Sequence, residues 1–105
     1  MIFRTNYGNY RVRVVCRRYC TGTLAIQLES YNGEPIATLT TNLDNGVCAA
    51  NGEEYAYVDT NNNPTAEEFI KENKLGTPTL IQSPSGYCVY PLYKFDLKRL
   101  REISK

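Results

Sequence analysis

Apolar and polar residues alternate along residues 10–19 of this chain, YRVRVVCRRY. A period of two is typical of a half-buried β-strand. The side that is expected to face inward holds Tyr10, Val12, Val14 and Cys16, and the outward side holds Arg11, Arg13, Val15 and Arg17. Residues 24–30, LAIQLES, repeat the alternation after a short polar stretch. The two segments are therefore expected to form a hairpin.

Three more hairpin or strand signals follow along the chain. Asn32 and Gly33 form the dipeptide that a tight type I′ turn requires, and β-branched residues 35–41 come next. Residues 54–59, EYAYVD, predict another strand. Residues 79–82 and 87–95 are expected to pair around a turn at residues 83–86, with Pro91 breaking the second strand or marking it as an edge. The polar residues 42–54 predict a mobile loop.

The stretch VDTNNNPTAEEF, residues 58–69, admits two interpretations. A calcium loop that began at Asp59 would place Pro64 where glycine is needed and Ile70 where a bidentate glutamate is needed. A helix start fits better, because Asn63 is a preferred N-cap and proline favours the first helical position. The residues just before Asn63 are then expected to make Asx-type turn bonds.

The helix is expected over residues 64–75, with Gly76 as the residue that ends it. Asp96 could cap a second, short helix over residues 97–103, LKRLREI. At 105 residues the chain is expected to form one domain. The predicted fold is α+β, a mainly antiparallel sheet of five to six strands with one helix packed on a face and a short C-terminal helix. Sheet order does not follow from these patterns.

Charge is distributed unevenly although the net charge is only +1. Residues 1–20 contain five arginines and no acid, residues 21–72 are mainly acidic, and residues 73–105 are mainly basic. The folded surface is expected to separate the two signs, or to mix them once the segments are packed together. No window approaches the ~20 apolar residues of a membrane span. We expect a cytoplasmic protein with reduced thiols.

Metal, cofactor and catalytic sites are not expected. Four cysteines could hold zinc, but only Cys16 and Cys20 are close in sequence and the chain has no histidine. Cys16 and Cys88 fall on the expected inner faces of strands, as small core residues do. A nucleophilic cysteine or serine would lack an imidazole base, and no glycine-rich phosphate loop is present. We therefore expect a protein that is not an enzyme.

Several segments resemble a family of small proteins of gut Gram-positive bacteria, which is known only as a domain of unknown function. They are YGNYRVRVVCRRYCTGTLAIQLES, GEPIATLTTNL, AYVDTNNNPTAEEFIKENKLG and SGYCVYPLYKFDLKRL, and they span nearly the whole chain. Members are associated with phages, plasmids and conjugative elements. The resemblance implies a mobile-element accessory protein, without a reaction, a ligand or a role for any residue.

Two functions are compatible with these observations. The first is binding to a host or element protein, for example as an inhibitor of a defence system such as a CRISPR effector. The alternative is binding to single-stranded nucleic acid, since arginines on a strand beside tyrosine can follow phosphates and stack bases. Outward arginines also protect exposed sheets from unwanted pairing. The candidate binding residues for either function are Arg11, Arg13, Arg17, Arg18 and Tyr19.

Overall fold

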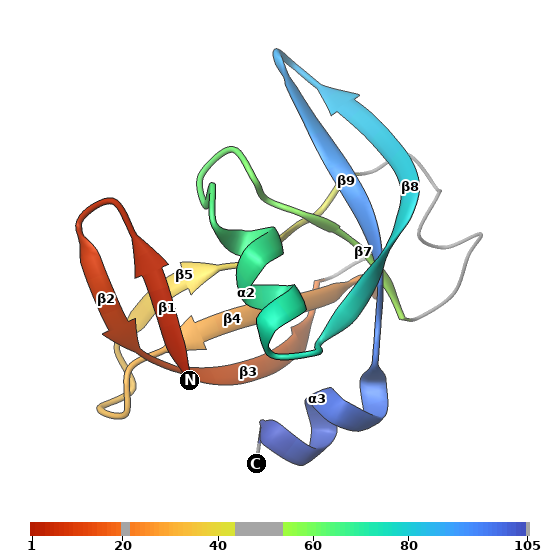
Figure 1. Cartoon of the computed structure of the whole chain (residues 1–105). Coiled ribbons are helices and arrows are strands. Elements are labelled where there is room, and N and C mark those ends of the chain that lie inside the picture. Colours follow the sequence, from red (N-terminus) through yellow and green to blue (C-terminus); the bar gives the residue numbers. More distant parts are fainter. Residues whose placement is uncertain (20–21, 44–53, 105) are drawn as a thin grey trace.

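The computed structural model describes residues 1–19, 22–43 and 54–104, which form three antiparallel sheets and two helices (Figure 1). The first sheet joins β1 (Ile2–Thr5) to β2 (Gly8–Arg11). The second has the order β3-β4-β5, from strands Arg13–Arg18, Leu24–Glu29 and Pro35–Thr38. The third has the order β6-β7-β9-β8, from strands Thr40–Thr41, Tyr55–Val58, Cys88–Phe95 and Gly76–Ser85. The helices are α2 (Ala66–Glu72) and α3 (Leu97–Ile103).

The predicted α+β class and the mainly antiparallel pairing are confirmed. The number of strands is not, because the described residues form nine strands in three sheets. Residues 42–54 were expected to form a loop, and most of them lie outside the described residues, as do Cys20 and Cys48.

The single first strand predicted over residues 10–19 is broken in two at Val12. Its side chain is fully buried, and its backbone N–H donates to the carbonyl oxygen of Met1 at 2.9 Å. The chain therefore leaves the hairpin of β1 and β2 and enters the sheet of β3. The sequence pattern concealed this break because Val12 and Val14 are both buried, so the period of two continues across it.

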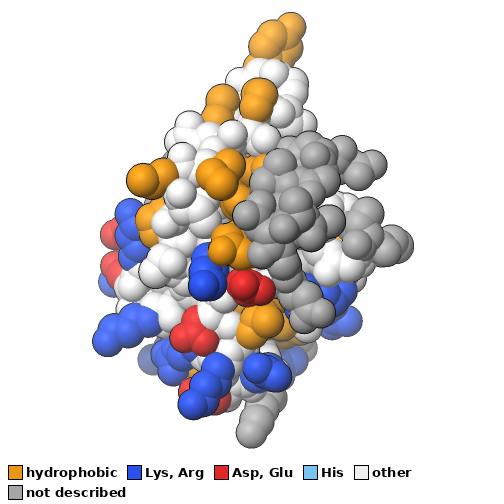
Figure 2. Space-filling model, turned by 90° about the vertical axis from the view of Figure 1, so that its right-hand side faces the viewer, with side chains coloured by type: hydrophobic (Ala, Val, Ile, Leu, Met, Phe, Trp, Pro, Cys, Tyr) orange, Lys and Arg blue, Asp and Glu red, His pale blue; other side chains and the backbone are white. Residues whose placement is uncertain are grey.

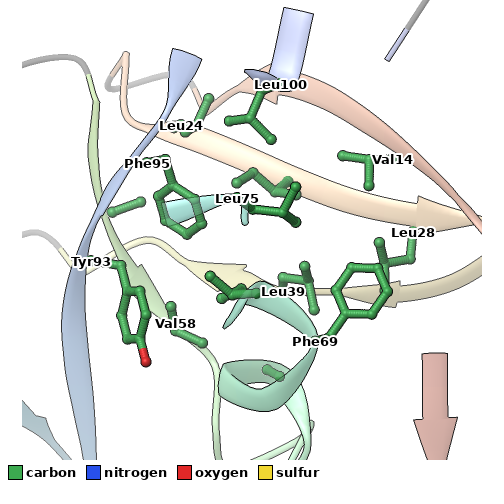
Figure 3. Close-up of a cluster of buried hydrophobic side chains, with 14 of the residues drawn as sticks. Val14, Leu24, Leu28, Leu39, Val58, Phe69, Leu75, Tyr93, Phe95 and Leu100 are labelled. Atoms are coloured by element: carbon green, nitrogen blue, oxygen red, sulfur yellow. The ribbon is translucent and has the colours of Figure 1, made fainter. Parts of the chain in front are cut away.

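One apolar core is shared by all three sheets and both helices (Figure 3). Phe3 of β1 meets Phe69 of α2 edge to face, with ring centroids 5.5 Å apart. The sheets contribute Val14, Leu24, Leu28, Val58, Tyr93 and Phe95, and α3 contributes Leu100. Burying one such side chain stabilises the fold by about 1.5–3 kcal/mol. A smaller cluster around Tyr57 and Leu92 lies on the other face of β7 and β9.

The helix α2 is shorter at both ends than the predicted residues 64–75. Its N-cap is Thr65, whose side chain makes no capping hydrogen bond, so Asn63 is not the cap. At the other end Lys74 takes a positive φ of 56°. The N–H groups of Lys74 and Leu75 donate to the carbonyls of Lys71 and Ile70, which is a Schellman closure. A lysine therefore takes the left-handed position that was predicted for Gly76.

Gly76 has a different structural role, because it opens β8 where two strands approach closely. A Cβ there would lie 2.7 Å from the carbonyl oxygen of Lys94, which is closer than real Cβ contacts. The turn between β8 and β9 consists of Gly86 and Tyr87, so it falls later than the predicted residues 83–86. The strand β9 continues through Pro91, where only β8 pairs with it, because the register of β7 ends opposite Leu92.

Tyr93 links β9 to α2 through a hydrogen bond. Its ring is buried, and its hydroxyl donates to Oε1 of Glu67 at 2.7 Å. Burial first, and then the bond to the Glu67 carboxylate, raise the pKa of Tyr93 above its ordinary value. The folded state therefore holds this proton more tightly than the unfolded chain does.

We predict a pH-dependent cost for Tyr93→Phe, which removes this bond. At pH 7 the variant should lose about 1.5–3 kcal/mol of unfolding free energy, as hydrogen bonds to charged groups usually contribute. The raised pKa makes this contribution fully present below about pH 10, the ordinary pKa of tyrosine, and lost as the pH rises further. Urea unfolding of both proteins from pH 7 to 11 should show their difference shrinking. Tyr31→Phe should match the wild type throughout, and an equally stable Tyr93→Phe at pH 7 would contradict the assignment.

Candidate functional site

The arginines of β3 face outward but are engaged with a neighbouring strand. Arg13 lies opposite Glu29 in the register of β3 and β4, and its Nη2 is 3.5 Å from Oε1 of that carboxylate. Nη2 of Arg17 lies 3.8 Å from the other oxygen of Glu29. The Glu29 side chain is only 14% exposed, whereas both arginines are about half exposed. The two arginines therefore neutralise a largely buried carboxylate while keeping guanidinium surface in solvent.

The other three predicted binding residues are distributed over different parts of the fold. Arg11 ends β2, before the break at Val12, and is exposed. Arg18 ends β3 and donates from Nη1 to the carbonyl of Gly22 at 3.2 Å. Tyr19 is half-buried, and its hydroxyl donates to the carbonyl of Thr40 at 3.0 Å. A ring held in this way fixes the end of the β3–β4 hairpin and offers less stacking surface than the sequence predicted.

The separation of charge along the sequence is reduced by packing. Each ion pair between described residues joins an arginine of residues 1–20 to an acid of residues 21–72, and the third such pair links Arg4 to Glu72 at 2.8 Å. Charged side chains of both signs lie over the lower part of the surface in Figure 2. Basic and acidic segments are thus mixed across these contacts.

The most unusual surface is the projecting end of the β8–β9 hairpin, which we call the arm and define as residues 79–91. It extends away from the rest of the molecule at the top of Figure 1. Its exposed apolar side chains are those of Leu80, Ile81, Tyr87 and Val89. Apolar side chains continue to the tip of the projection in Figure 2. No Lys, Arg, Asp or Glu occurs over residues 76–93, so the arm has no charge.

The arm offers its side chains to a partner, whereas its backbone is poorly suited to pairing with another strand. The strand β8 is an outer strand of its sheet, but Pro78 and Pro84 have no N–H to offer a further strand. The register between β8 and β9 is also interrupted from Pro78 to Gln82. Leu80 lies in this interruption with a φ of 70°, a region that leucine rarely adopts, and its side chain is 95% exposed. The backbone thus holds a large apolar side chain in solvent.

The alternating residues and the arginines predicted a binding surface on the first strand, and the arm was not predicted as one. A simple signal was nevertheless present in the sequence. Exposed strands usually carry charges that prevent association, and a strand–turn–strand signature with none over residues 76–93 departs from that rule. The expected edge position of Pro91 pointed to the same hairpin.

The asparagine run, which we define as residues 59–65, connects elements and does not cap the helix. Nδ2 of Asn63 donates to the carbonyl of Thr38 at 2.7 Å, which ties the run to β5. The backbone N–H and Nδ2 of Asn62 both donate to the carboxylate of Asp59, so the predicted Asx-type turn is confirmed. Thr65 donates from Oγ1 to the carbonyl of Arg4 and thereby ties the same segment to β1.

The cysteine on β3 has the chemistry of a packed thiol. Cys16 is half-buried, and burial raises its pKa more than the hydrogen bond with Ser104 and the charge of Arg18 lower it. A thiol with a raised pKa holds little reactive thiolate at neutral pH. Within the described ranges no three Cys, His, Asp or Glu side chains gather as metal ligands would. None of the helices in this part of the chain is long and apolar enough to cross a membrane.

Fold and surface together define a small α+β domain with an uncharged, apolar arm. The family model of DUF4313, a domain of unknown function, matches residues 15–105 of the chain. The chain therefore belongs to this family, in agreement with the expected uncharacterised family. Neither a curated protein nor a solved structure matches it.

We predict that Asn63→Ala destabilises the protein because it removes the hydrogen bond from Asn63 to β5, and not because it removes a helix cap. The carbonyl of Thr38 would lose its partner, at a cost of about 1–3 kcal/mol in unfolding free energy. Asn61→Ala is the matched control, because the Asn61 side chain makes no hydrogen bond within the described residues. Thermal and urea unfolding would measure both. Equal stability of the two variants would show that the hydrogen bond between Asn63 and Thr38 contributes nothing to the unfolding free energy.

Proposed function

We propose that this protein is a non-enzymatic binding module that recognises another protein through the side chains of the arm. The observation that carries this proposal is a charge-free projection with exposed apolar side chains, on a domain that carries charges of both signs over the lower part of its surface in Figure 2. Exposed apolar patches on small proteins commonly mark protein contacts. Tyrosine is among the residues that most often anchor such contacts, and Tyr87 lies at the tip.

The arrangement favours docking of side chains over the addition of a strand. The two prolines and the interrupted register leave few backbone groups of β8 for pairing. Leu80 and Ile81 are exposed beside the interrupted register, and Tyr87 and Val89 are exposed near the tip. A partner with an apolar recess would bury these side chains together. The absence of charge lowers the desolvation cost of this burial.

The resemblance to proteins of phages, plasmids and conjugative elements supports a narrower proposal. The protein would act in the cytoplasm on a host or element protein, and a component of a bacterial defence system such as a CRISPR effector is the suggested target. Small proteins without catalytic groups inhibit larger ones by occupying a surface, and a projecting arm suits this mode of action.

We expect the double variant Leu80→Asn, Tyr87→Ser to keep its stability and lose its partner. Asparagine tolerates a positive φ better than leucine does, and neither side chain is packed in the core. Loss of two anchoring residues should weaken binding by about 2 kcal/mol or more, roughly 30-fold in affinity. Immobilised protein, nuclease-treated host lysate and quantitative mass spectrometry would identify the partner.

Tyr31→Ser is the matched control, because Tyr31 is an exposed tyrosine at the turn between β4 and β5. It should capture the partner as the wild type does. Capture that survives the double variant, or that Tyr31→Ser also abolishes, would refute the role of the arm.

Binding to single-stranded nucleic acid is the second candidate, and exposed arginines favour it. Arg11, Arg13, Arg17 and Arg18 are all exposed on the surface of β2 and β3. Glu29 weakens this candidate, since its carboxylate already neutralises part of the charge of two of them. Tyr19 adds no free hydroxyl, because its hydroxyl is bound to Thr40.

A variant with Arg11, Arg13 and Arg17 changed to Gln separates the two candidates. Glu29 would lose both partners, so the same variant with Glu29→Gln added is the control for folding. We expect short single-stranded DNA to bind neither the wild type nor the variants at micromolar concentration in ~0.15 M salt. Micromolar binding by the wild type, with a salt slope that falls by nearly one unit per lost phosphate contact, would favour nucleic acid instead.

A further inference from the structure

A hollow lies away from the arm, between the β1–β2 hairpin, β5 and the asparagine run. Its volume is about 460 Å³, within the ~300–1,000 Å³ of typical ligand pockets. Asn6, Tyr7 and Tyr10 line it from the hairpin, and Asn61 lines it from the asparagine run. The side chains of Tyr7 and Asn61 are exposed, so a ligand could reach them from solvent. In Figure 1 the hairpin lies in front of β5, at the left of the molecule.

The walls of this cleft are held in place before any ligand arrives. Asn63 ties the asparagine run to Thr38 of β5, and Thr65 ties it to Arg4 of β1. Across the cleft, Oγ1 of Thr5 donates to the carbonyl of Gly8 and accepts from the N–H of Tyr7, which closes the hairpin turn. These bonds fix the backbone of the walls, so binding requires ordering of the lining side chains and not of the loops that carry them.

The described lining combines apolar residues, such as Phe3 and Ile36, with uncharged polar ones. Among the described residues that line the cleft there is no Lys, Arg, Asp or Glu. This described lining therefore offers no cation to a phosphate or carboxylate and no carboxylate to a metal ion. Within the described residues, the side chains of Asn6, Tyr7, Tyr10 and Asn61 make no hydrogen bonds. Two amides, each a donor and an acceptor, and two tyrosyl hydroxyls are therefore available to a ligand.

An extended peptide is a poorer match to this cleft than a small ligand is. Three consecutive residues of β5 line it, Pro35, Ile36 and Ala37, so the cleft follows the strand edge. Pro35 has no N–H, the register with β4 shifts next to Ile36, and the carbonyl of Thr38 is already occupied by Asn63. An added strand would lack the regular backbone ladder that it needs.

We propose that this cleft binds an uncharged, hydroxyl-rich ligand of saccharide size. Each hydroxyl of such a ligand both donates and accepts, as the two asparagine amides do. The ring faces of Tyr7 and Tyr10 offer apolar surface to the C–H groups of a sugar ring, while their hydroxyls bond at the edge. The site is separate from the arm, so it would operate whether or not the arm binds a protein.

The test is an NMR titration of the ¹⁵N-labelled full chain with maltose, lactose, cellobiose and N,N′-diacetylchitobiose. At least one should shift the side-chain amide signals of Asn6 and Asn61 in a saturable manner, with a dissociation constant on the order of 1 mM, as few contacting atoms allow. Tyr7→Ala and Asn61→Ala should each weaken this binding at least fivefold. Tyr31→Ala, which removes an exposed ring outside the cleft, should leave it unchanged.

Three further probes distinguish other ligands in the same experiment. They are glucose 6-phosphate, which adds charge, adenosine, which adds a planar base, and a capped GTVTG peptide. Saturable shifts at Asn6 and Asn61 from adenosine or the peptide but from no saccharide would overturn the proposal. Three other results would also overturn it. They are tighter binding of glucose 6-phosphate than of any saccharide, a loss of saccharide affinity in Tyr31→Ala equal to that in Tyr7→Ala or Asn61→Ala, and no shift of these signals at about 10 mM saccharide. Should Tyr7→Ala lose its dispersed spectrum, Asn61→Ala decides the outcome.

Discussion

The fold depends on one apolar core that three small sheets share. A two-stranded hairpin is marginally stable in water by itself, and a sheet gains stability when it packs its apolar face on another element. The β1–β2 hairpin meets that need through Phe3, which packs on Phe69 of α2. The other two sheets contribute Leu28 and Phe95 to the same cluster. The break at Val12 follows from this constraint, because the chain must enter the core between the first two sheets.

The arm is the part of the third sheet that lies beyond this core. Tyr93 and Phe95 lie on the core face of β9 and are buried. Val89 falls on the same side of the strand by the period of two, but it is exposed. Apolar side chains thus continue outward along the strand after the partners that would cover them have ended. Stability of the isolated domain gains nothing from Leu80 at a positive φ or from an exposed Tyr87. The proposed protein partner would cover these apolar residues.

The sequence predicts those features of this fold that depend on neighbouring residues. The alternation of β3 and β4 and the last helix follow from local patterns, and Asp96 does cap that helix through the N–H of Arg99. A turn does form at Asn32 and Gly33, but it is not the predicted type I′ turn: of the two residues only Gly33 has a positive φ, 86°, and its N–H donates to the carbonyl of Ser30. Features that depend on distant partners could not be predicted in this way. Asn63 has the chemistry of an N-cap, yet its amide bonds to Thr38, 25 residues earlier in the chain. Glu29 likewise became the partner of two arginines only when β3 and β4 paired.

The difference between local and distant partners also determines whether the arm and the cleft can be recognised from the sequence. The arm is built from one hairpin, so its lack of charge is visible in the amino-acid sequence of residues 76–93 alone. The cleft is built from the turn at Asn6 and Tyr7, one edge of β5, and the run that contains Asn61, three segments far apart in sequence. Its neutral lining appears only when Asn63 and Thr65 bring those segments together. The asparagine run therefore has a structural role and a chemical one: its bonded residues assemble the cleft, and its unbonded amide remains available to a ligand.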